Sequence, residues 1–203
     1  MRTVGRVIKY IFIAMIIGVF LVFLFRCAVM TDPESMTVLL ASDEMKEVYS
    51  RNGSLEAYTQ EMVNGVISQD GRFYTTGLII LPETDELVIT LRYNDGVLTS
   101  MAEKYGLSEV YGGEEYFSYY LKDSEGNTYE PEAIICERKW RYSYRRMRFS
   151  GIDVSKYTDV ALCVRYIGSD EDEEDFGSVF AYHQDWEKKA YKLTAADRKE
   201  LEK

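Results

Sequence analysis

The segment 137–149 carries the residue types best suited to binding an anionic ligand. It reads Glu-Arg-Lys-Trp-Arg-Tyr-Ser-Tyr-Arg-Arg-Met-Arg-Phe, so basic side chains are interleaved with aromatic ones. A guanidinium group offers several N–H donors in a planar fork that matches carboxylate and phosphate groups. The segment therefore predicts a binding patch for an anionic envelope polymer, a lipid headgroup or an acidic partner, formed by Arg138, Lys139, Arg141, Arg145, Arg146 and Arg148.

The same segment also fits a core strand. Side chains alternate between the two faces of a strand, which places Trp140, Tyr142 and Tyr144 on one face and Arg141 and Arg145 on the other. The basic side chains would then pair with an acidic surface. If they form a binding patch instead, charge reversal of Arg145, Arg146 and Arg148 should weaken binding, and the domain should still fold.

Catalytic motifs are absent from the sequence. His183 is the single histidine, so any Ser-His-Asp or Cys-His arrangement would have to use it, and no Gly-x-Ser-x-Gly motif is present. One histidine and three scattered cysteines do not supply a zinc site of the usual spacing. We therefore expect His183 to be a hydrogen-bonded residue at a strand end, and we predict no catalytic residue and no cofactor.

Carboxylates leave two further hypotheses open. The run of six acidic residues at 170–175 either binds calcium or forms a solvated loop, and it lacks the spaced ligands of an EF-hand loop. Two carboxylates are enough to hydrolyse a glycoside, yet no pair stands out among the 34 acidic residues. A carboxylate with a raised pKa in a cleft would favour such a hydrolase, and a sandwich without a cleft would argue against it.

The charge is distributed unevenly along the chain. Arg2, Arg6, Lys9 and Arg26 lie within residues 1–30, whereas all 34 acidic residues follow that segment, and the net charge is −10. An acidic domain repels polyanions at long range, which argues against nucleic acid as a partner.

Residues 7–30 form a predicted transmembrane segment. Residues 10–25 contain no charged side chain, and a helix through 7–30 is long enough to cross the ~30 Å hydrocarbon core of a membrane. Neither a cleavage site with small residues nor a lipoprotein signal fits the residues at Phe25-Arg26-Cys27, so we expect an uncleaved signal anchor. Because more basic residues precede the span than follow it, residues 1–6 are predicted to be cytoplasmic and the rest extracytoplasmic.

The outer part of the chain changes from a helical to a mostly β pattern. Asp32-Pro33-Glu34 has the form of a helix start, and Asn52-Gly53 that of a stop, so residues 31–54 are predicted to form a short helix or stalk. Alternating apolar runs and turn residues then predict a β-sandwich over 55–192 with a short helix at 97–105. The polar tail at 193–203 is expected to be a frayed surface helix or a disordered end. Strands are expected at 72–81, 87–93, 116–121, 128–136, 140–149, 159–167 and 176–183.

Two of the three cysteines fall within these expected strands. Cys27 lies at the edge of the membrane span, which leaves Cys136 and Cys163 as the pair available inside the domain. They either form a disulfide or are ordinary small core residues, and the sequence leaves both alternatives open.

The pattern Phe117-x-Tyr119-x-Leu121-x-Asp123-x-x-Gly126-x-x-Tyr129 resembles a hairpin of immunoglobulin-like domains in small cell-surface proteins of Gram-positive bacteria. Residues 91–94 and 140–149 also resemble parts of uncharacterised single-pass membrane proteins of that group. The resemblance implies an Ig-like β-sandwich. It implies no site, because that group has no established chemistry. The paired cysteines around a core Trp that mark antibody domains do not fit here, since Cys136 and Trp140 are close in sequence.

Together these features predict a mainly β, Ig-like β-sandwich with one or two short helices behind a transmembrane helix. We expect a membrane-anchored, extracytoplasmic interaction or accessory domain without catalytic activity, held in the cell membrane by residues 7–30. Its partner would be a membrane protein or an anionic envelope polymer. The alternative function is binding or hydrolysis of envelope glycan through paired carboxylates.

Overall fold

A computed structural model of the chain describes residues 2–60, 73–105, 117–166 and 174–203. The chain divides into two compact units, Met1–Pro33 and Glu34–Lys203. Each unit is described by itself below.

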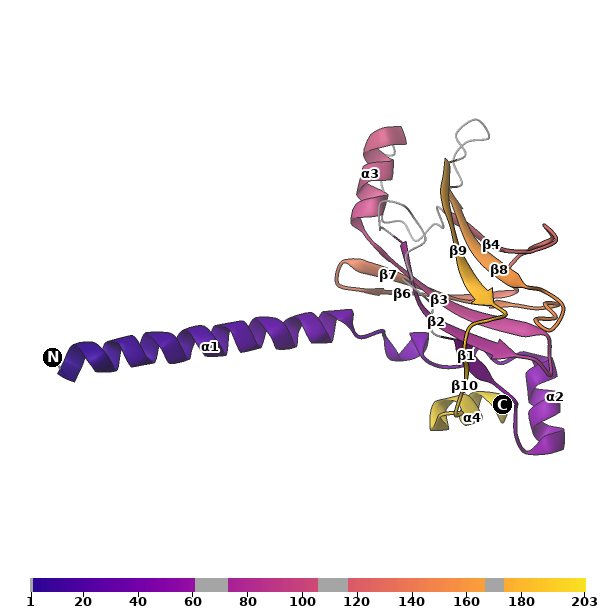
Figure 1. Cartoon of the computed structure of the whole chain (residues 1–203), viewed down its shortest axis with the longest axis horizontal. Coiled ribbons are helices and arrows are strands. Elements are labelled where there is room, and N and C mark those ends of the chain that lie inside the picture. Colours follow the sequence, from indigo (N-terminus) through magenta and orange to yellow (C-terminus); the bar gives the residue numbers. More distant parts are fainter. Residues whose placement is uncertain (1, 61–72, 106–116, 167–173) are drawn as a thin grey trace. The chain divides into compact units, whose positions relative to one another are not determined.

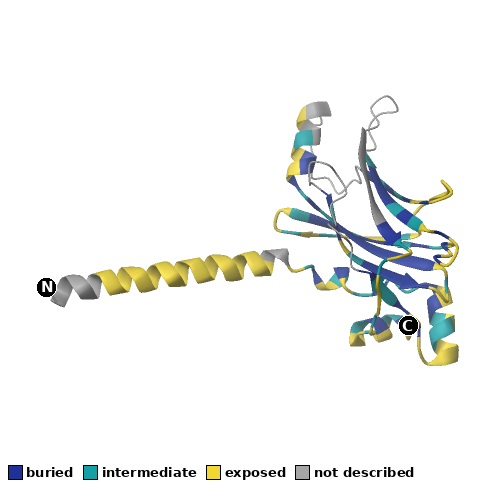
Figure 2. Ribbon diagram, in the orientation of Figure 1, coloured by how far each residue is buried: buried dark blue, intermediate teal, exposed yellow. Residues whose placement is uncertain are grey.

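The first unit is one long helix, α1 (Arg2–Met30). Within it, Ile8–Ala28 has a mean hydropathy of 2.7 and is not buried by any other part of the chain. Figure 2 shows the described side chains exposed along this helix. A helix of 21 residues rises about 31 Å, which matches the hydrocarbon thickness of a bilayer. The predicted apolar helix at 7–30 is therefore confirmed, and it is long and apolar enough to cross a membrane.

The second unit is a β-sandwich of two antiparallel sheets (Figure 1), as the sequence predicted. In the described residues, sheet A has the strand order β10-β1-β2-β3-β7-β6 and sheet B the order β5-β4-β8-β9. The strands of sheet A are β1 (Tyr58–Gln60), β2 (Phe73–Leu81), β3 (Glu86–Asn94), β6 (Ala133–Lys139), β7 (Tyr142–Phe149) and β10 (Lys188–Ala190). Those of sheet B are β4 (Phe117–Asp123), β5 (Thr128–Tyr129), β8 (Asp159–Tyr166) and β9 (Glu174–His183), and the helix α3 (Gly96–Tyr105) follows β3.

The main core lies between the two sheets. Leu87, Ile89 and Leu91 of β3 point into it, because alternate residues of a strand share a face. Aromatic rings fill one part of this core: the centroid of Phe73 lies 5.3 Å from that of Tyr93 and 5.2 Å from that of Phe117. Edge-to-face and tilted contacts at these distances stabilise a core beyond the burial of area alone.

The other face of sheet A, called the outer face here, is also covered. Val88 of β3 and Leu81 of β2 pack there against Leu39, Met45 and other residues of a second cluster. The covering elements are the short 3-10 helix η1 (Glu34–Met36), α2 (Asp43–Asn52) and α4 (Ala195–Leu201). Because both faces of β3 are covered, every residue from Glu86 to Leu91 is buried.

Residues 31–54, expected to form a short helix or stalk, contain the short helix α2, but this helix starts later than expected. Leu39 and Met45 are fully buried, so the predicted stalk region contributes to the folded unit. The helix begins at Asp43. Its N-cap is Ser42, whose hydroxyl accepts a hydrogen bond from the Met45 amide at 3.0 Å, and not Asp32. Gly53 ends it in a left-handed conformation at φ 68°, as its sequence position predicted.

The polar tail, expected to be a frayed surface helix or a disordered end, contains the short helix α4. Thr194 and Asp197 form a capping box at the start of α4. The Asp197 carboxylate is fully buried and also accepts hydrogen bonds from the Leu39 amide (2.7 Å) and the Tyr191 hydroxyl (2.8 Å). The C-terminal helix is therefore tied to the segment that opens the folded unit.

The expected return strand at 128–136 divides into two. Thr128 and Tyr129 pair with β4 as β5, and after Pro131 the chain crosses to sheet A and continues as β6 beside β7. Proline has no N–H to donate to a ladder, so it ends the pairing with β4. Two short strands, β1 and β10, were not predicted from the sequence.

Candidate functional site

The six basic residues predicted as a binding patch lie on the β6–β7 hairpin, but the structure does not gather them on one surface. Arg146 is only 3% exposed on the outer face of sheet A. Its Nη1 donates to the Met36 carbonyl oxygen at 2.7 Å and to the Thr90 hydroxyl at 2.6 Å. It therefore holds η1 against the sheet and is not available to a ligand.

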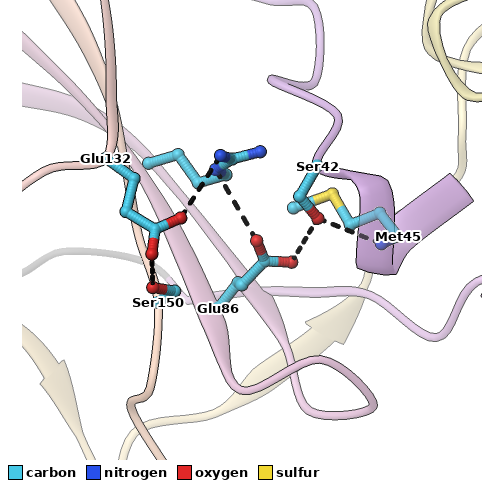
Figure 3. Close-up of polar contacts among 6 residues, drawn as sticks. Ser42, Met45, Glu86, Glu132 and Ser150 are labelled. Carbon is cyan, nitrogen blue, oxygen red and sulfur yellow. Dashed lines mark hydrogen bonds and ion pairs between the residues drawn. The ribbon is translucent and has the colours of Figure 1, made fainter.

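Arg148 forms ion pairs with two carboxylates on the same face, those of Glu86 and Glu132, which are labelled in Figure 3. Its Nε is 3.6 Å from an oxygen of Glu86, and its Nη2 is 3.3 Å from an oxygen of Glu132. The other oxygen of Glu132 accepts a hydrogen bond from the Ser150 hydroxyl. The other oxygen of Glu86 accepts a hydrogen bond from Ser42, the N-cap of α2, at 3.1 Å. This network joins β3 and β7 to the start of α2.

Glu86 is almost completely buried within this network. Burial raises its pKa, and this effect exceeds the opposite effect of hydrogen bonds from Thr84 and Ser42 and of the Arg148 charge. The carboxylate is covered by the N-terminal end of α2 and does not line the groove described below. We therefore assign the raised pKa to burial of a carboxylate that has a structural role in the ion-pair network.

Arg138 and Arg145 lie on the opposite face of the hairpin, toward the sandwich interior. Arg138 contacts the Asp95 carboxylate through Nε (2.8 Å) and Nη2 (2.6 Å), and Asp95 precedes α3. Arg145 donates to the Tyr93 hydroxyl at 2.9 Å. Both guanidinium groups thus stabilise the corner where β3, β7 and α3 meet.

The remaining basic residues are Lys139, the last residue of β6, and Arg141, in the turn between β6 and β7. Arg141 is exposed and Lys139 is half-buried. Trp140 lies in the turn with φ 59° and is 62% exposed, so it does not share a strand face with Tyr142 and Tyr144 as expected. Four of the six basic residues, Arg138, Arg145, Arg146 and Arg148, contact other residues of this chain. This agrees with the alternative hypothesis that the segment is a strand whose basic side chains pair within the domain.

An open groove lies between sheet B and the beginning of β6. It has a volume of about 630 Å³, within the ~300–1,000 Å³ typical of ligand sites. The aromatic side chains of β4 form its apolar part, together with Ile134 and Pro131. Its lining residues are Phe117, Ser118, Tyr119, Tyr120, Lys122, Gly126, Thr128, Glu130, Pro131, Ile134 and Arg165.

Charged and aromatic groups are combined in this groove. The Arg165 guanidinium lies over the Tyr120 ring, 5.5 Å from its centroid, and donates to the Tyr120 hydroxyl at 3.4 Å. Lys122 and Glu130 add an exposed base and an exposed acid. Such a surface suits a polypeptide segment that has both apolar and charged side chains.

The turn beside the groove is held by Asp123. Its carboxylate accepts hydrogen bonds from the backbone of Glu125 and Asn127 (both 2.9 Å), from the Asn127 side chain and from the Tyr129 hydroxyl (both 2.8 Å). Burial acts to raise the pKa of Asp123, but these hydrogen bonds outweigh it and lower the pKa to about 2. The turn from Asp123 to Tyr129, one wall of the groove, is therefore rigidly shaped.

His183 lies at the end of β9, as predicted. Its ring stacks on Trp186 with the centroids 5.6 Å apart, and its Nδ1 accepts a hydrogen bond from the Asp185 amide at 3.2 Å. Residues 170–173 of the acidic run lie outside the described residues, so the calcium hypothesis stays a prediction. Within the described part of the chain, no cluster of three or more potential metal ligands is found.

Cys136 and Cys163 are not joined in a disulfide. Cys136 is exposed on β6 of sheet A, whereas Cys163 is buried on β8 of sheet B. The alternative of a bridge is therefore wrong for this structure, and Cys163 is one of the small residues that fill a buried position.

Comparison of the chain with protein-family models, with curated proteins and with solved structures found no match. The resemblance to Ig-like domains of Gram-positive surface proteins stays a prediction. The fold and the groove therefore carry the functional argument. No sequence pattern predicted the groove, because its walls come from β4, β5, β6 and β8. Pro131 alone marks the point where the chain changes sheets.

Proposed function

We propose that this protein is a single-pass, membrane-tethered β-sandwich domain that binds a segment of a membrane-protein partner in the groove beside β4. It acts as an accessory or interaction domain and catalyses no reaction. The observation that carries this proposal is the groove of about 630 Å³, which combines aromatic, basic and acidic side chains.

The anchor supports the proposed location. Arg2, Arg6 and Lys9 precede the apolar stretch and Arg26 lies near its end, so the positive-inside rule places the N-terminus in the cytoplasm and the sandwich outside. The folded unit begins at Glu34, six residues after the apolar stretch ends at Ala28. So short a connection keeps the domain close to other membrane proteins.

The rival hypothesis of glycan hydrolysis finds little support in the groove. Glu130 is the one carboxylate among the groove's lining residues, whereas glycosidases use two carboxyl groups about 5–10 Å apart. Glu86, whose pKa is raised, belongs to the ion-pair network on the outer face of sheet A. We therefore favour binding over hydrolysis.

Site-specific photocrosslinking in cells tests the proposed groove. A photoreactive amino acid replaces Lys122 or Thr128, both exposed in the groove, or Lys199, exposed on α4, in the full-length protein. We expect one membrane-protein partner to be crosslinked from Lys122 and Thr128 but not from Lys199. The substitution Lys122→Glu should lower recovery of that partner, whereas the matched control Lys199→Glu should not.

Other outcomes of this experiment would overturn the proposal. Equal crosslinking from Lys199 would show that the groove is not the contact site. A crosslinked species that resists protease and contains sugar would instead support envelope-glycan binding.

A further inference from the structure

The tip of the β6–β7 hairpin, residues 139–141, presents a large aromatic side chain to solvent. Two residues, Trp140 and Arg141, separate the two strands (Figure 1). Trp140 is 62% exposed, and among the described residues outside α1 no large apolar side chain is more exposed. Such a side chain needs an explanation that burial in the domain core does not supply.

The backbone of the turn does not explain the choice of tryptophan. Of the two turn residues, only Trp140 has a positive φ, 59°. A two-residue hairpin loop with this feature favours glycine at its first position, because a side chain there is strained. Tryptophan is therefore an unfavourable residue for the turn itself, which directs attention to what its exposed ring contacts outside the domain.

The tip lies close to the place where the folded unit begins. The Ser35 hydroxyl donates a hydrogen bond to the Glu137 carboxylate, and Trp140 follows Glu137 by three residues, about 10 Å along the strand. The next residue, Met36, contacts Arg146 of β7, which lies farther from the turn. Followed from Met36 back to Ser35, the chain thus approaches the tip.

The connection between the apolar stretch and this point is short. The apolar stretch ends at Ala28, and Ser35 follows it by seven residues, which span at most about 25 Å when fully extended. The proposed function places the apolar stretch in a membrane. The surface of that membrane is therefore within reach of the tip.

We infer that the tip of the β6–β7 hairpin docks on the surface of the bilayer that holds α1, with the Trp140 ring at the level of the lipid headgroups. Tryptophan prefers this level, because its ring is apolar and its N–H can donate a hydrogen bond. Arg141, which is exposed, and Lys139, which is half-buried, flank the ring and suit headgroup phosphates. The inference rests on the membrane anchoring of the proposed function and not on what the groove binds.

The acidity of the domain as a whole does not oppose this contact. Repulsion between exposed charges is largely screened beyond about 8 Å at physiological ionic strength. Two acids close to the tip have partners in the chain: Asp95 contacts Arg138, and Glu137 accepts a hydrogen bond from Ser35. Glu34 in the connection is exposed, so the basic surface is confined to the tip.

Fluorescence quenching by brominated lipids tests the contact. The chain contains two tryptophans, so Trp186→Phe leaves Trp140 alone, and the matched control Trp140→Phe leaves Trp186 alone. Trp186 precedes β10, which forms the opposite edge of sheet A from β6. Both full-length proteins are reconstituted in vesicles of phosphatidylcholine and phosphatidylglycerol, with or without bromine on the acyl chains near the headgroups. We expect brominated lipid to remove at least about half of the Trp140 emission and little of the Trp186 emission, because a docked ring lies at the interface.

A charge variant tests the role of the basic residues at the tip. With Trp140 as the single tryptophan, Arg141→Glu should reduce the quenching in these vesicles, because a carboxylate repels the anionic headgroups. The control Lys199→Glu, on the exposed side of α4, should leave the quenching unchanged. Urea unfolding in detergent verifies that each variant is folded.

Three results would overturn the inference. They are the absence of Trp140 quenching, equal quenching of the two tryptophans, and protection of Trp140 from a water-soluble quencher only when a partner protein is bound. Retention of the chain in the vesicles after alkaline extraction is measured in parallel. Retention without quenching rejects the docked tip and leaves the anchor of the proposed function intact, whereas extraction of the chain rejects both.

Discussion

The Arg146 guanidinium donates to the Met36 carbonyl oxygen at 2.7 Å, a contact that joins the middle of β7 to the first turn of the folded unit. The same nitrogen binds the Thr90 hydroxyl of β3. A buried guanidinium is costly to remove from water, so it is stable only where such acceptors surround it. Arg146, one of the six residues predicted to form the binding patch, thus attaches the segment after the apolar helix to the sheet.

Charge reversal of Arg146 should therefore unfold the domain, contrary to the expectation for a binding patch. Arg146→Glu would direct a carboxylate at the Met36 carbonyl oxygen, and we expect a loss of at least about 4 kcal/mol in the free energy of unfolding. The exposed control Arg141→Glu should change it by about 0.5 kcal/mol or less. Urea unfolding of the full chain in detergent checks both. A folded, stable Arg146→Glu protein would contradict the assignment.

The ion pair of Arg148 with Glu86 should show strong coupling. Arg148→Met leaves the buried Glu86 carboxylate without its cation, and we expect a loss of about 2–4 kcal/mol of stability. The double variant Arg148→Met, Glu86→Gln should recover part of that loss, because no buried charge remains. A double-mutant cycle from urea unfolding gives the coupling energy, and additive effects would show that the two residues do not interact.

Glu86 should also affect the pH dependence of stability. Its pKa is raised in the folded state, so the folded protein binds a proton more tightly than the unfolded chain does. The contribution of Glu86 to the free energy of unfolding is therefore most favourable below the pKa of Glu86 in the unfolded chain. It is lost as the pH rises through the pKa of Glu86 in the folded protein. Relative to wild type, Glu86→Gln should become more stable as the pH rises from about 4 to 7. A stability difference that does not change with pH would contradict this.

Asp123 should change the pH dependence of stability in the direction opposite to that of Glu86. Its pKa is lowered to about 2, so its stabilising effect is present above the unfolded pKa and is lost as the pH falls toward 2. Asp123→Asn should lower stability at neutral pH by about 1–3 kcal/mol, because a charged acceptor of four hydrogen bonds is replaced. The difference from wild type should shrink below about pH 4. Unfolding curves recorded from pH 2 to 7 measure both effects.

The C-terminal helix should be necessary for stability. Asp197→Ala removes the acceptor for the Leu39 amide and for Thr194, and leaves these donors buried in part, so we expect a loss of about 2–4 kcal/mol. Lys199→Ala, on the exposed side of the same helix, serves as the control and should change stability little. If both variants unfold at the same urea concentration, the helix is not anchored through Asp197.

Local patterns in the sequence determined much of the architecture. The uncharged stretch at 10–25 indicated the long apolar helix, since hydrocarbon length requires such a run. Alternating apolar residues indicated β2, β3, β4, β7, β8 and β9, and Gly53 marked the end of α2. These features depend on periodicity and on backbone preferences within a few residues, and both can be read without knowledge of the fold.

Tertiary structure decided which side of each element is buried and what each charge contacts. The same alternation in 142–149 fits either an exposed basic face or a face covered by η1 and the start of α2. Only the packing of residues 34–42 selects the second alternative. Residues 128–136 were predicted as one return strand, yet the chain crosses between sheets after Pro131, and β6 is an edge strand of sheet A among the described residues, with Ile134 and Ile135 exposed. Burial depends on neighbours that are distant in sequence, so the groove, the ion-pair network and the open edge arise only when the two sheets come together.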